Sequence, residues 1–405
     1  MKNRIQTWLA LIVVAIGLLV AAILGLFAYM SLTATPLHPN LQDVPSVTHS
    51  APLPKWATAV EQGRQIVRAG LTEQNLPGLS VAVGAGGEIV WAEGFGWADL
   101  ENRVKVEPGT RFRIGTASKA LTSAAVGLLL EKNQLKLDDE IQTYVPAFPK
   151  KQWPVTLRQV MGHVAGVRND GGDEENLSTR CEGPLEGLPR FAERPLLVEP
   201  GTQYRYSNYG WILVSAAVEA AADEPFFRFM RRQIFEPLGL DDTRADDATE
   251  PVRDRANFYF PKFSADPRYG PQPHRDVDYS CFAGAAAFLS TPSDLVRFVM
   301  AINSGKLLQP ATVQLLQAPQ RLASGQETGY GLGWDLETVE LAGKQTRVAG
   351  YDGELMGGMV VSFMTFPEQG IVVSVASNTA YADTASLALK VAQAFAEQGR
   401  SPARK

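Results

Sequence analysis

The sequence has few of the residues that build metal sites and disulfide frameworks. It contains two cysteines, Cys181 and Cys281, and four histidines among 405 residues. Two cysteines supply neither a multi-disulfide scaffold nor the ligand set of a structural zinc site, and the histidines are not in metal-ligand spacing. We therefore expect a globular protein with no metal site and no cofactor.

The charge of the chain is also not extreme in either direction. Its formal net charge is -5, with 20% charged and 45% hydrophobic residues. This balance excludes collagen-like, coiled-coil and disordered classes, and it leaves enough apolar residues for a sizeable core. A mildly acidic chain has no basic footprint for nucleic acid, so we expect no such partner. The length fits one large domain or two modest ones.

The N-terminal segment lacks charge over a long hydrophobic run. No charged residue lies between Trp8 and Met30, and these 23 residues are mostly Leu, Ile, Val and Ala. A helix of this length crosses a hydrocarbon core of about 30 Å. Lys2 and Arg4 precede the run, so the positive-inside rule predicts a cytoplasmic N-terminus and a periplasmic or extracellular domain. We expect residues 1–31 to form an uncleaved, single-pass membrane anchor.

A cleaved signal peptide is the alternative interpretation of this segment. The apolar region of a signal peptide spans about 7–15 residues and precedes a cleavage site made of small residues. Here the run is longer, and residues 29–34 form a poor cleavage site. Five prolines then punctuate residues 32–55, which is typical of an extended linker. We expect the folded domain to comprise residues 56–400.

The hydrophobic patterns of the domain predict an α+β fold. Helical patterns open the domain at residues 56–69 and close it at residues 385–397. We expect one antiparallel sheet flanked by these terminal helices, with a helix-rich lobe from about residue 117 to residue 315 inserted into it. An active site would lie in the crevice between sheet and lobe. The expected strands are residues 79–83, 89–97, 359–366 and 371–377.

One segment carries a hydroxyl and an amine at helical spacing. Thr116 and Lys119 lie three residues apart at the start of a predicted helix, so they share one face. A buried lysine can lose its proton and activate such a hydroxyl, and we expect burial to lower the pKa of Lys119. Ser118 points about 100° away from Lys119, so we expect it to pack or to form local hydrogen bonds. By itself this spacing is common and uninformative.

The neighbouring residues make the pair specific. Phe112 to Gly115 and Ser118 to Thr122 resemble the nucleophile helix of serine β-lactamases and penicillin-binding peptidases, above all in the class C β-lactamase and esterase branch. The family pattern is Ser-x-x-Lys, so Thr116 occupies the position of the serine. Ser280 to Thr291 resembles a segment of mitochondrial β-lactamase-like peptidases. The resemblance implies a β-lactamase/transpeptidase-like fold for nearly the whole exported domain.

A second motif follows in the order that the family predicts. Residues 204–210 resemble the family's Tyr-x-Asn element. The resemblance implies that Tyr206 serves as a base and that Asn208 presents an amide to the substrate. A tyrosine has a pKa near 10, so it needs an adjacent ammonium, which Lys119 would supply. We expect His163, in a turn that also resembles the family, to form structural hydrogen bonds rather than to act as a base.

The third motif of the family, Lys/His-x-Gly on an edge strand, is matched by residues 350–357. Tyr351 stands where the family carries a basic residue, and Gly353 is expected to let the substrate backbone approach closely. The resemblance implies an oxyanion hole made by the backbone N–H groups of Thr116 and Glu354. We therefore expect Asn208, Tyr351, Gly353 and Glu354 to contact the substrate.

At two positions, Thr116 and Tyr351, the sequence differs from the family pattern, and these differences limit the reactions that we expect. The methyl group of Thr116 stiffens the side chain and crowds the attack, and Tyr351 supplies no charge for a substrate carboxylate. This argues against ordinary β-lactam turnover, although Lys119, Tyr206 and Asn208 are retained. We expect a hydrolase or peptidase that forms an acyl-enzyme with a small-molecule or peptide substrate. The alternatives are a pseudoenzyme that keeps the cleft as a binding site and an esterase for small esters; the oligomeric state is left open.

The two cysteines are expected to be free thiols. Cys181 falls near the end of an acidic, glycine-containing stretch that we interpret as an exposed loop, residues 169–182. Cys281 lies in a segment of small residues that we expect to be packed. An exported domain meets an oxidising compartment, but these two environments do not predict a pairing.

Overall fold

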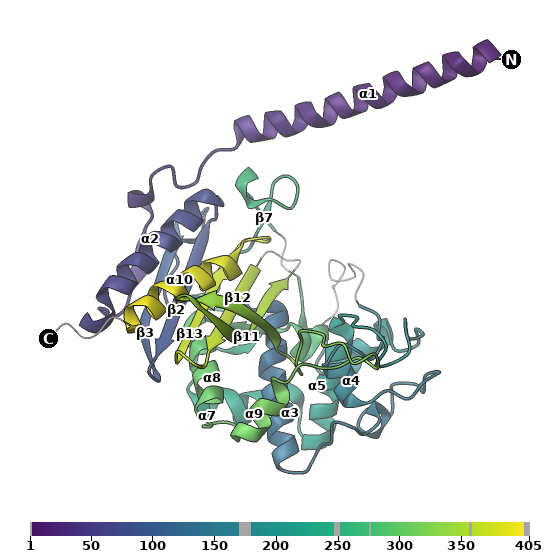
Figure 1. The fold of residues 1–405 in the computed structure, drawn as a ribbon, viewed down its shortest axis with the longest axis vertical. Helices are drawn as coiled ribbons and strands as arrows, with labels where there is room; N and C mark the ends of the chain where they lie inside the picture. Colours follow the sequence, from purple (N-terminus) through teal and green to yellow (C-terminus); the bar gives the residue numbers. More distant parts are fainter. Residues whose placement is uncertain (1, 170–179, 247–251, 275–276, 356–358, 401–405) are drawn as a thin grey trace.

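Strands from both ends of the domain form one antiparallel sheet (Figure 1). The computed structural model describes residues 2–169, 180–246, 252–274, 277–355 and 359–400. The sheet has the order β1-β3-β2-β13-β12-β11-β10, and β4 pairs with β3 outside this path. Its strands are β1 (Ser46–Thr48), β2 (Gly78–Ala85), β3 (Glu88–Asp99), β4 (Val104–Lys105), β10 (Asp335–Leu341), β11 (Lys344–Leu355), β12 (Met359–Phe366) and β13 (Ile371–Ser377).

Helices cover both faces of this sheet. The terminal helices α2 (Ala57–Glu73) and α10 (Thr384–Arg400) lie side by side on one face (Figure 1). Every residue of β2, β12 and β13 is buried, because a sheet covered on both faces has no strand surface left for water. The lobe on the other face contains α3 (Ser118–Glu131), α4 (Leu157–Met161), α5 (Asn208–Ala222), α6 (Phe226–Met230), α7 (Glu236–Leu238), α8 (Pro292–Asn303) and α9 (Pro310–Leu316).

Short elements connect the lobe to the sheet. A three-stranded sheet has the order β5-β9-β6, and β7 pairs with β8 in a separate hairpin. The single-turn helix η3 (Gly115–Ala117) directly precedes α3, and η9 (Ser280–Ala285) packs against α5. The remaining strands are β5 (Phe112–Arg113), β6 (Arg244–Ala245), β7 (Tyr259–Pro261), β8 (Pro271–Pro273) and β9 (Phe288–Ser290).

The predicted α+β architecture is confirmed, and the expected strands at residues 359–366 and 371–377 have the observed bounds. Parts of the expected linker at residues 32–55 pack against the domain instead. Within it, β1 (Ser46–Thr48) pairs with β3 at the edge of the main sheet, and Val44 is buried. A three-residue strand is too short to produce a recognisable alternation, so the sequence pattern does not reveal it.

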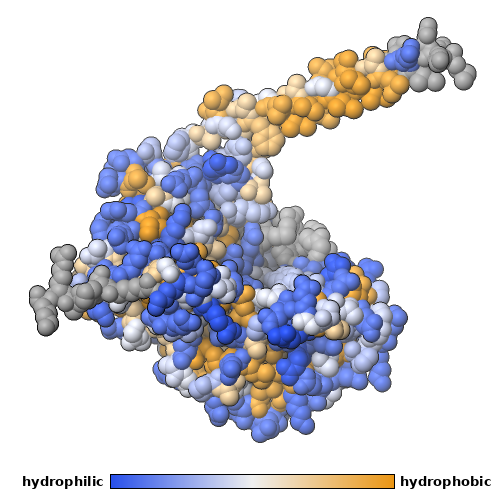
Figure 2. All heavy atoms as spheres, in the orientation of Figure 1, coloured by the Kyte–Doolittle hydropathy of each residue, from blue (hydrophilic) through white to orange (hydrophobic). Residues whose placement is uncertain are grey.

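The N-terminal helix α1 (Lys2–Thr33) extends away from the folded domain (Figure 1). Its segment Trp8–Thr33 is 26 residues long, has a mean hydropathy of 3.1 and is not buried against the rest of the protein. Figure 2 shows apolar side chains along most of its length. Within the described part of the chain, this is the one helix long and apolar enough to cross a membrane. An anchor and a signal sequence both have these properties.

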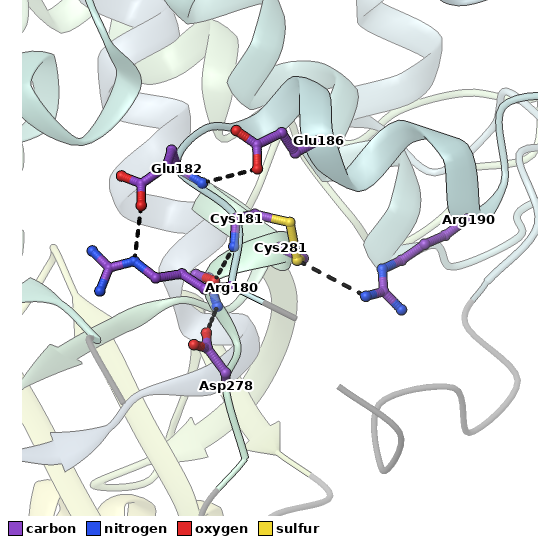
Figure 3. The surroundings of a disulfide bond; sticks show 8 residues. Arg180, Cys181, Glu182, Glu186, Arg190, Asp278 and Cys281 are labelled. Carbon is purple, nitrogen blue, oxygen red and sulfur yellow. Dashed lines mark hydrogen bonds and ion pairs between the residues drawn. A yellow bond between two sulfur atoms is a disulfide. The ribbon is translucent and has the colours of Figure 1, made fainter. Parts of the chain in front are cut away.

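Cys181 and Cys281 form a disulfide, so the expectation of two free thiols is wrong (Figure 3). Cys181 is 5% exposed, and its backbone N–H donates to the Ser280 hydroxyl at 2.8 Å. The Cα atoms of Cys181 and Cys281 lie 4.8 Å apart, although the two residues are 100 positions apart in the sequence. The error arose because the loop-like composition before Cys181 does not show that the chain returns to the core at this residue.

Candidate active site

Thr116 lies at the junction of the sheet and the helical lobe. It occupies η3, where Gly115 has a left-handed φ of 53° that turns the chain from β5 toward α3. Thr116 is 8% exposed, its Oγ1 accepts the Glu354 N–H at 3.2 Å, and its hydroxyl lies near enough to the Tyr206 phenol to lower the pKa of that phenol. Ser118 is fully buried, and its Oγ has no hydrogen-bond partner among the described residues. Of the two hydroxyls, only that of Thr116 reaches the site.

Lys119 is held at the centre of the site by converging acceptors. Its side chain is fully buried, and Nζ donates to Tyr206 Oη at 2.8 Å, to Asn208 Oδ1 at 2.7 Å and to the Ala285 carbonyl at 3.3 Å. Three acceptors match the three N–H donors of an ammonium group. Nζ also lies 4.9 Å and 5.7 Å from the ring centroids of Tyr206 and Tyr351. Lys119 is therefore rigidly placed, and its burial works against its charge.

Tyr206 joins the hydroxyl of Thr116 to the amine of Lys119. Burial raises the pKa of Tyr206 well above its ordinary value, although hydrogen bonds from Tyr351 and Thr116 lower it. The phenol is therefore protonated at neutral pH. A neutral phenol with one partner on each side is suited to pass a proton from Thr116 to Lys119.

His163 positions the loop that carries Tyr206. Its Nδ1 accepts the Ser207 N–H at 3.1 Å, and its carbonyl accepts the Arg205 N–H at 2.7 Å. Burial and the nearby charge of Lys119 lower the pKa of His163 well below its ordinary value. The imidazole is therefore neutral and accepts rather than donates at Nδ1. This geometry agrees with the structural role predicted from the sequence.

Asn208 begins α5 and faces Lys119 rather than open solvent. It is 5% exposed, and Ser207 caps the helix by accepting the Gly210 N–H at 2.9 Å. The Asn208 side-chain oxygen accepts from Lys119, and its backbone N–H donates to Asn169 Oδ1 at 2.7 Å. The amide expected to face a substrate thus also fixes the position of the Lys119 amine.

The edge of β11 presents a backbone N–H to the nucleophile. Beyond its pairing with β10, which ends at Gly350 opposite Asp335, the strand continues to Leu355 and presents the Glu354 N–H to Thr116. Gly353 is needed here for a different reason from the one expected. A Cβ on Gly353 would come within 2.7 Å of Ala117 and 2.6 Å of the Ile114 carbonyl. Glycine therefore lets β11 approach η3, which sets the distance between Glu354 and Thr116.

Tyr351 belongs to a group of buried phenols. Its Oη lies 3.2 Å from Tyr330 Oη and 3.5 Å from Tyr206 Oη. Burial raises the pKa of both Tyr330 and Tyr351 well above the ordinary value, so both are neutral. Sequence reasoning missed Tyr330. The available signal was its place in a run of alternating glycines and aromatics, where Gly329 and Gly333 have positive φ.

Asp335 is the second site residue that sequence reasoning missed. It begins β10, and its Oδ2 accepts the Asp352 N–H at 3.3 Å. Burial raises the pKa of Asp335 to about 6. No motif marks this residue, because its place in the site depends on the pairing of β10 with β11. Within the described ranges, no group of three His, Cys, Asp or Glu side chains could hold a metal ion.

Comparison with known proteins supports the resemblance found in the sequence. Human serine beta-lactamase-like protein LACTB, mitochondrial, is 27% identical over 84% of this chain and 80% of its own length. Penicillin-binding protein 4* of Bacillus subtilis is 25% identical over 65% of this chain and 61% of its own length. The crystal structure of FmtA from Staphylococcus aureus matches with a TM-score of 0.71 at 19% identity, over 88% of this chain and 94% of that chain.

A family model also matches most of the chain. The model described as Beta-lactamase matches residues 64–396, which include every strand of the main sheet except β1. The match also includes Thr116, Lys119, Tyr206 and the β11 edge, the parts of the candidate site. The chain therefore belongs to the β-lactamase family.

Proposed function

We propose that this chain is a membrane-anchored, exported hydrolase or peptidase that works through an acyl-enzyme on Thr116. Membership of the β-lactamase family supports hydrolase activity. One observation carries the assignment of the nucleophile. Thr116 Oγ1 accepts the Glu354 N–H and lies next to Tyr206, whose Oη lies 2.8 Å from Lys119 Nζ. A hydroxyl, a proton path and an oxyanion donor thus meet at one point.

In the proposed acylation, Thr116 Oγ1 forms a bond to the substrate carbonyl carbon. The hydroxyl proton passes to the Tyr206 phenol as the phenol gives its own proton to the amine form of Lys119. The phenol therefore never has to exist as a free phenolate, which its raised pKa disfavours. The bond to the leaving group then breaks, and the leaving group receives its proton through Tyr206. Water hydrolyses the acyl-enzyme by the same path in reverse.

The developing negative charge would lie in the oxyanion hole. The Glu354 N–H that now contacts Thr116 Oγ1 would donate to the carbonyl oxygen together with the Thr116 N–H. Loss of one such donor costs about 10²–10³-fold in rate in other acyl-transfer enzymes. Gly353 contributes indirectly, because any side chain there would push the donor away from η3.

Intact mass spectrometry after covalent labelling tests the proposal. The full-length protein in detergent is incubated with a fluorophosphonate and, separately, with a fluorescent penicillin. We expect one probe per chain with the phosphonate, and slow or absent labelling with the penicillin because Tyr351 supplies no positive charge for its carboxylate. Labelling by either probe would support acyl-transfer chemistry, in the hydrolase or in the esterase alternative, and would count against the pseudoenzyme. No adduct from several electrophiles on a folded protein would favour a pseudoenzyme that keeps the cleft as a binding site.

The anchor and the export of the domain form a separate part of the proposal. The apolar helix Trp8–Thr33 is preceded by Lys2 and Arg4, and the Cys181–Cys281 disulfide is of a kind that persists in oxidising compartments. We expect the mature protein to sediment with membranes and to retain the N-terminal peptide. Mature chains that begin between Ser31 and Asn40 and are found in the soluble fraction would show instead a cleaved signal peptide.

A further inference from the structure

The side chain of Tyr351 is electrically neutral. Tyr351 is 4% exposed, and its phenol is enclosed by those of Tyr330 and Tyr206. Burial, followed by the fields of Tyr206, Tyr330 and Asp335, raises its pKa well above the ordinary value. A substrate carboxylate would meet no compensating charge at this residue. Substrate binding at this site must therefore depend on a charged group other than Tyr351 or on uncharged contacts.

Asp335 places a carboxylate at the edge of β11, beside the proposed oxyanion donor. Asp335 Oδ2 accepts the Asp352 N–H, and Glu354 presents the next outward-facing N–H along the same free edge of β11. Alternate residues of a strand are about 7 Å apart, so the carboxyl group lies roughly one dipeptide repeat from the oxyanion donor. Oδ2 makes the one side-chain hydrogen bond of Asp335 to the described residues, and the residue is half-buried rather than fully enclosed.

The field of this carboxylate reaches the whole group of phenols. Burial is the main reason that the phenol pKa values are raised, and the charge of Asp335 raises them further. The residues affected are Tyr204, Tyr206, Tyr330 and Tyr351. Because Tyr206 delivers the proton to the leaving group in the proposed mechanism, Asp335 acts on the leaving-group side of the site.

The exposed ring of Tyr204, backed by the buried ring of Tyr330, offers an aromatic face near Asp335 to an ammonium group. Tyr204 and Tyr330 have ring centroids 6.0 Å apart, and Tyr204 is 37% exposed. A cation beside a carboxylate and over tyrosine rings gains from both the charge and the ring quadrupoles. A carboxylate in the same place would be repelled by Asp335.

We propose that the site acts on acyl donors whose leaving group carries a protonated amine, and that Asp335 binds this amine. The inference rests on the proposed acyl-transfer function and names its substrate class. Asp335 is a specificity-determining residue on this view, while Thr116, Lys119 and Tyr206 carry out the chemistry. Peptides and esters with an amine-bearing leaving group are the chemical class implied.

Three esters with one acyl group and differently charged leaving groups test the proposal. The benzoyl esters of 3-(aminomethyl)phenol, 3-(hydroxymethyl)phenol and 3-hydroxybenzoic acid give the same acyl-enzyme, so kcat/KM reports acylation alone. With the full-length protein in neutral detergent at pH 7.5, we expect the cationic ester to exceed the neutral one by about tenfold, and the neutral ester to exceed the anionic one. Equal values for the three esters would overturn the inference.

Two variants test whether the preference for the cationic ester comes from the Asp335 carboxyl group. Asp335→Asn should bring the ratio of the cationic to the neutral ester close to one, whereas Glu337→Gln removes an equal charge from the exposed side of β10 and should keep it. Retention of the ratio in Asp335→Asn would overturn the assignment. If the neutral ester is not hydrolysed and no acyl-enzyme forms, the proposed function fails and this inference with it. Turnover of all three esters without preference leaves the function standing and overturns the inference alone.

The pH dependence supplies an independent readout. Since burial raises the pKa of Asp335 to about 6, its carboxyl group loses its charge as the pH falls through 6. The preference for the cationic ester should therefore be full at pH 7.5, decline through pH 6 and be absent in Asp335→Asn at every pH. A preference that is constant from pH 7.5 to pH 5 would contradict the role of Asp335. The charged groups that act on Asp335 are Asp352, Lys119 and Glu337.

Discussion

Replacement of Thr116 by alanine should abolish acylation of the protein. The variant removes the hydroxyl that contacts both the Glu354 N–H and the Tyr206 phenol, so no nucleophile remains on the proton path to Lys119. General-base activation alone contributes about 10²–10⁴-fold, and the acylation rate should fall at least that far. The measurement is the rate of phosphonate labelling, followed by mapping of the modified peptide.

Thr116→Ser and Ser118→Ala are the matched controls for this prediction. Serine keeps the nucleophilic oxygen and removes the methyl group that stiffens the side chain, so Thr116→Ser should preserve or raise the rate. Ser118 is fully buried, and its Oγ makes no hydrogen bond to the described residues, so Ser118→Ala should change the rate little. An adduct mapped to Ser118, or full activity in Thr116→Ala, would reverse the assignment of the nucleophile.

Removal of the Cys181–Cys281 disulfide should produce the largest loss of stability. The bond closes a loop of 100 residues, and the chain-entropy model assigns about 4–5 kcal/mol to a loop of this length. The bond also fixes η9, whose Ala285 carbonyl accepts from Lys119, so the activity should decline as well. We expect a Cys181→Ala/Cys281→Ala variant to unfold at lower denaturant concentration, as measured by fluorescence in guanidinium.

Reduction of the parent protein provides the comparison for this variant. The two sulfurs are almost fully buried, with Cys181 5% and Cys281 0% exposed, so reductant should act only when the protein opens. Dithiothreitol during unfolding should lower the stability of the parent and leave the double variant unchanged. A double variant that unfolds within about 1 kcal/mol of the parent would show that the cross-link contributes little beyond the contacts around it.

The motifs that could be predicted from the sequence are those whose functional residues lie close together along the chain. Thr116 and Lys119 lie one helical turn apart, and Tyr206 and Asn208 flank the cap of α5, so their spacing is visible in the chain. The strands at residues 359–366 and 371–377 were predictable for the same reason, because each is a continuous apolar run bounded by turn residues. The long apolar N-terminal helix is also a local property.

What the sequence determined by itself, then, was the family, the layered α+β fold and the residues of the local motifs. Only the tertiary structure decided the remaining features of the site. The Cys181–Cys281 bond spans 100 residues, and Asp335 reaches the site only through the register of β10 on β11. The close approach at Gly353 and the raised pKa of Tyr206 likewise depend on neighbours that are distant in the sequence. The physical reason is that burial, contact distance and pKa depend on which segments pack together, and residue spacing along the chain does not contain that information.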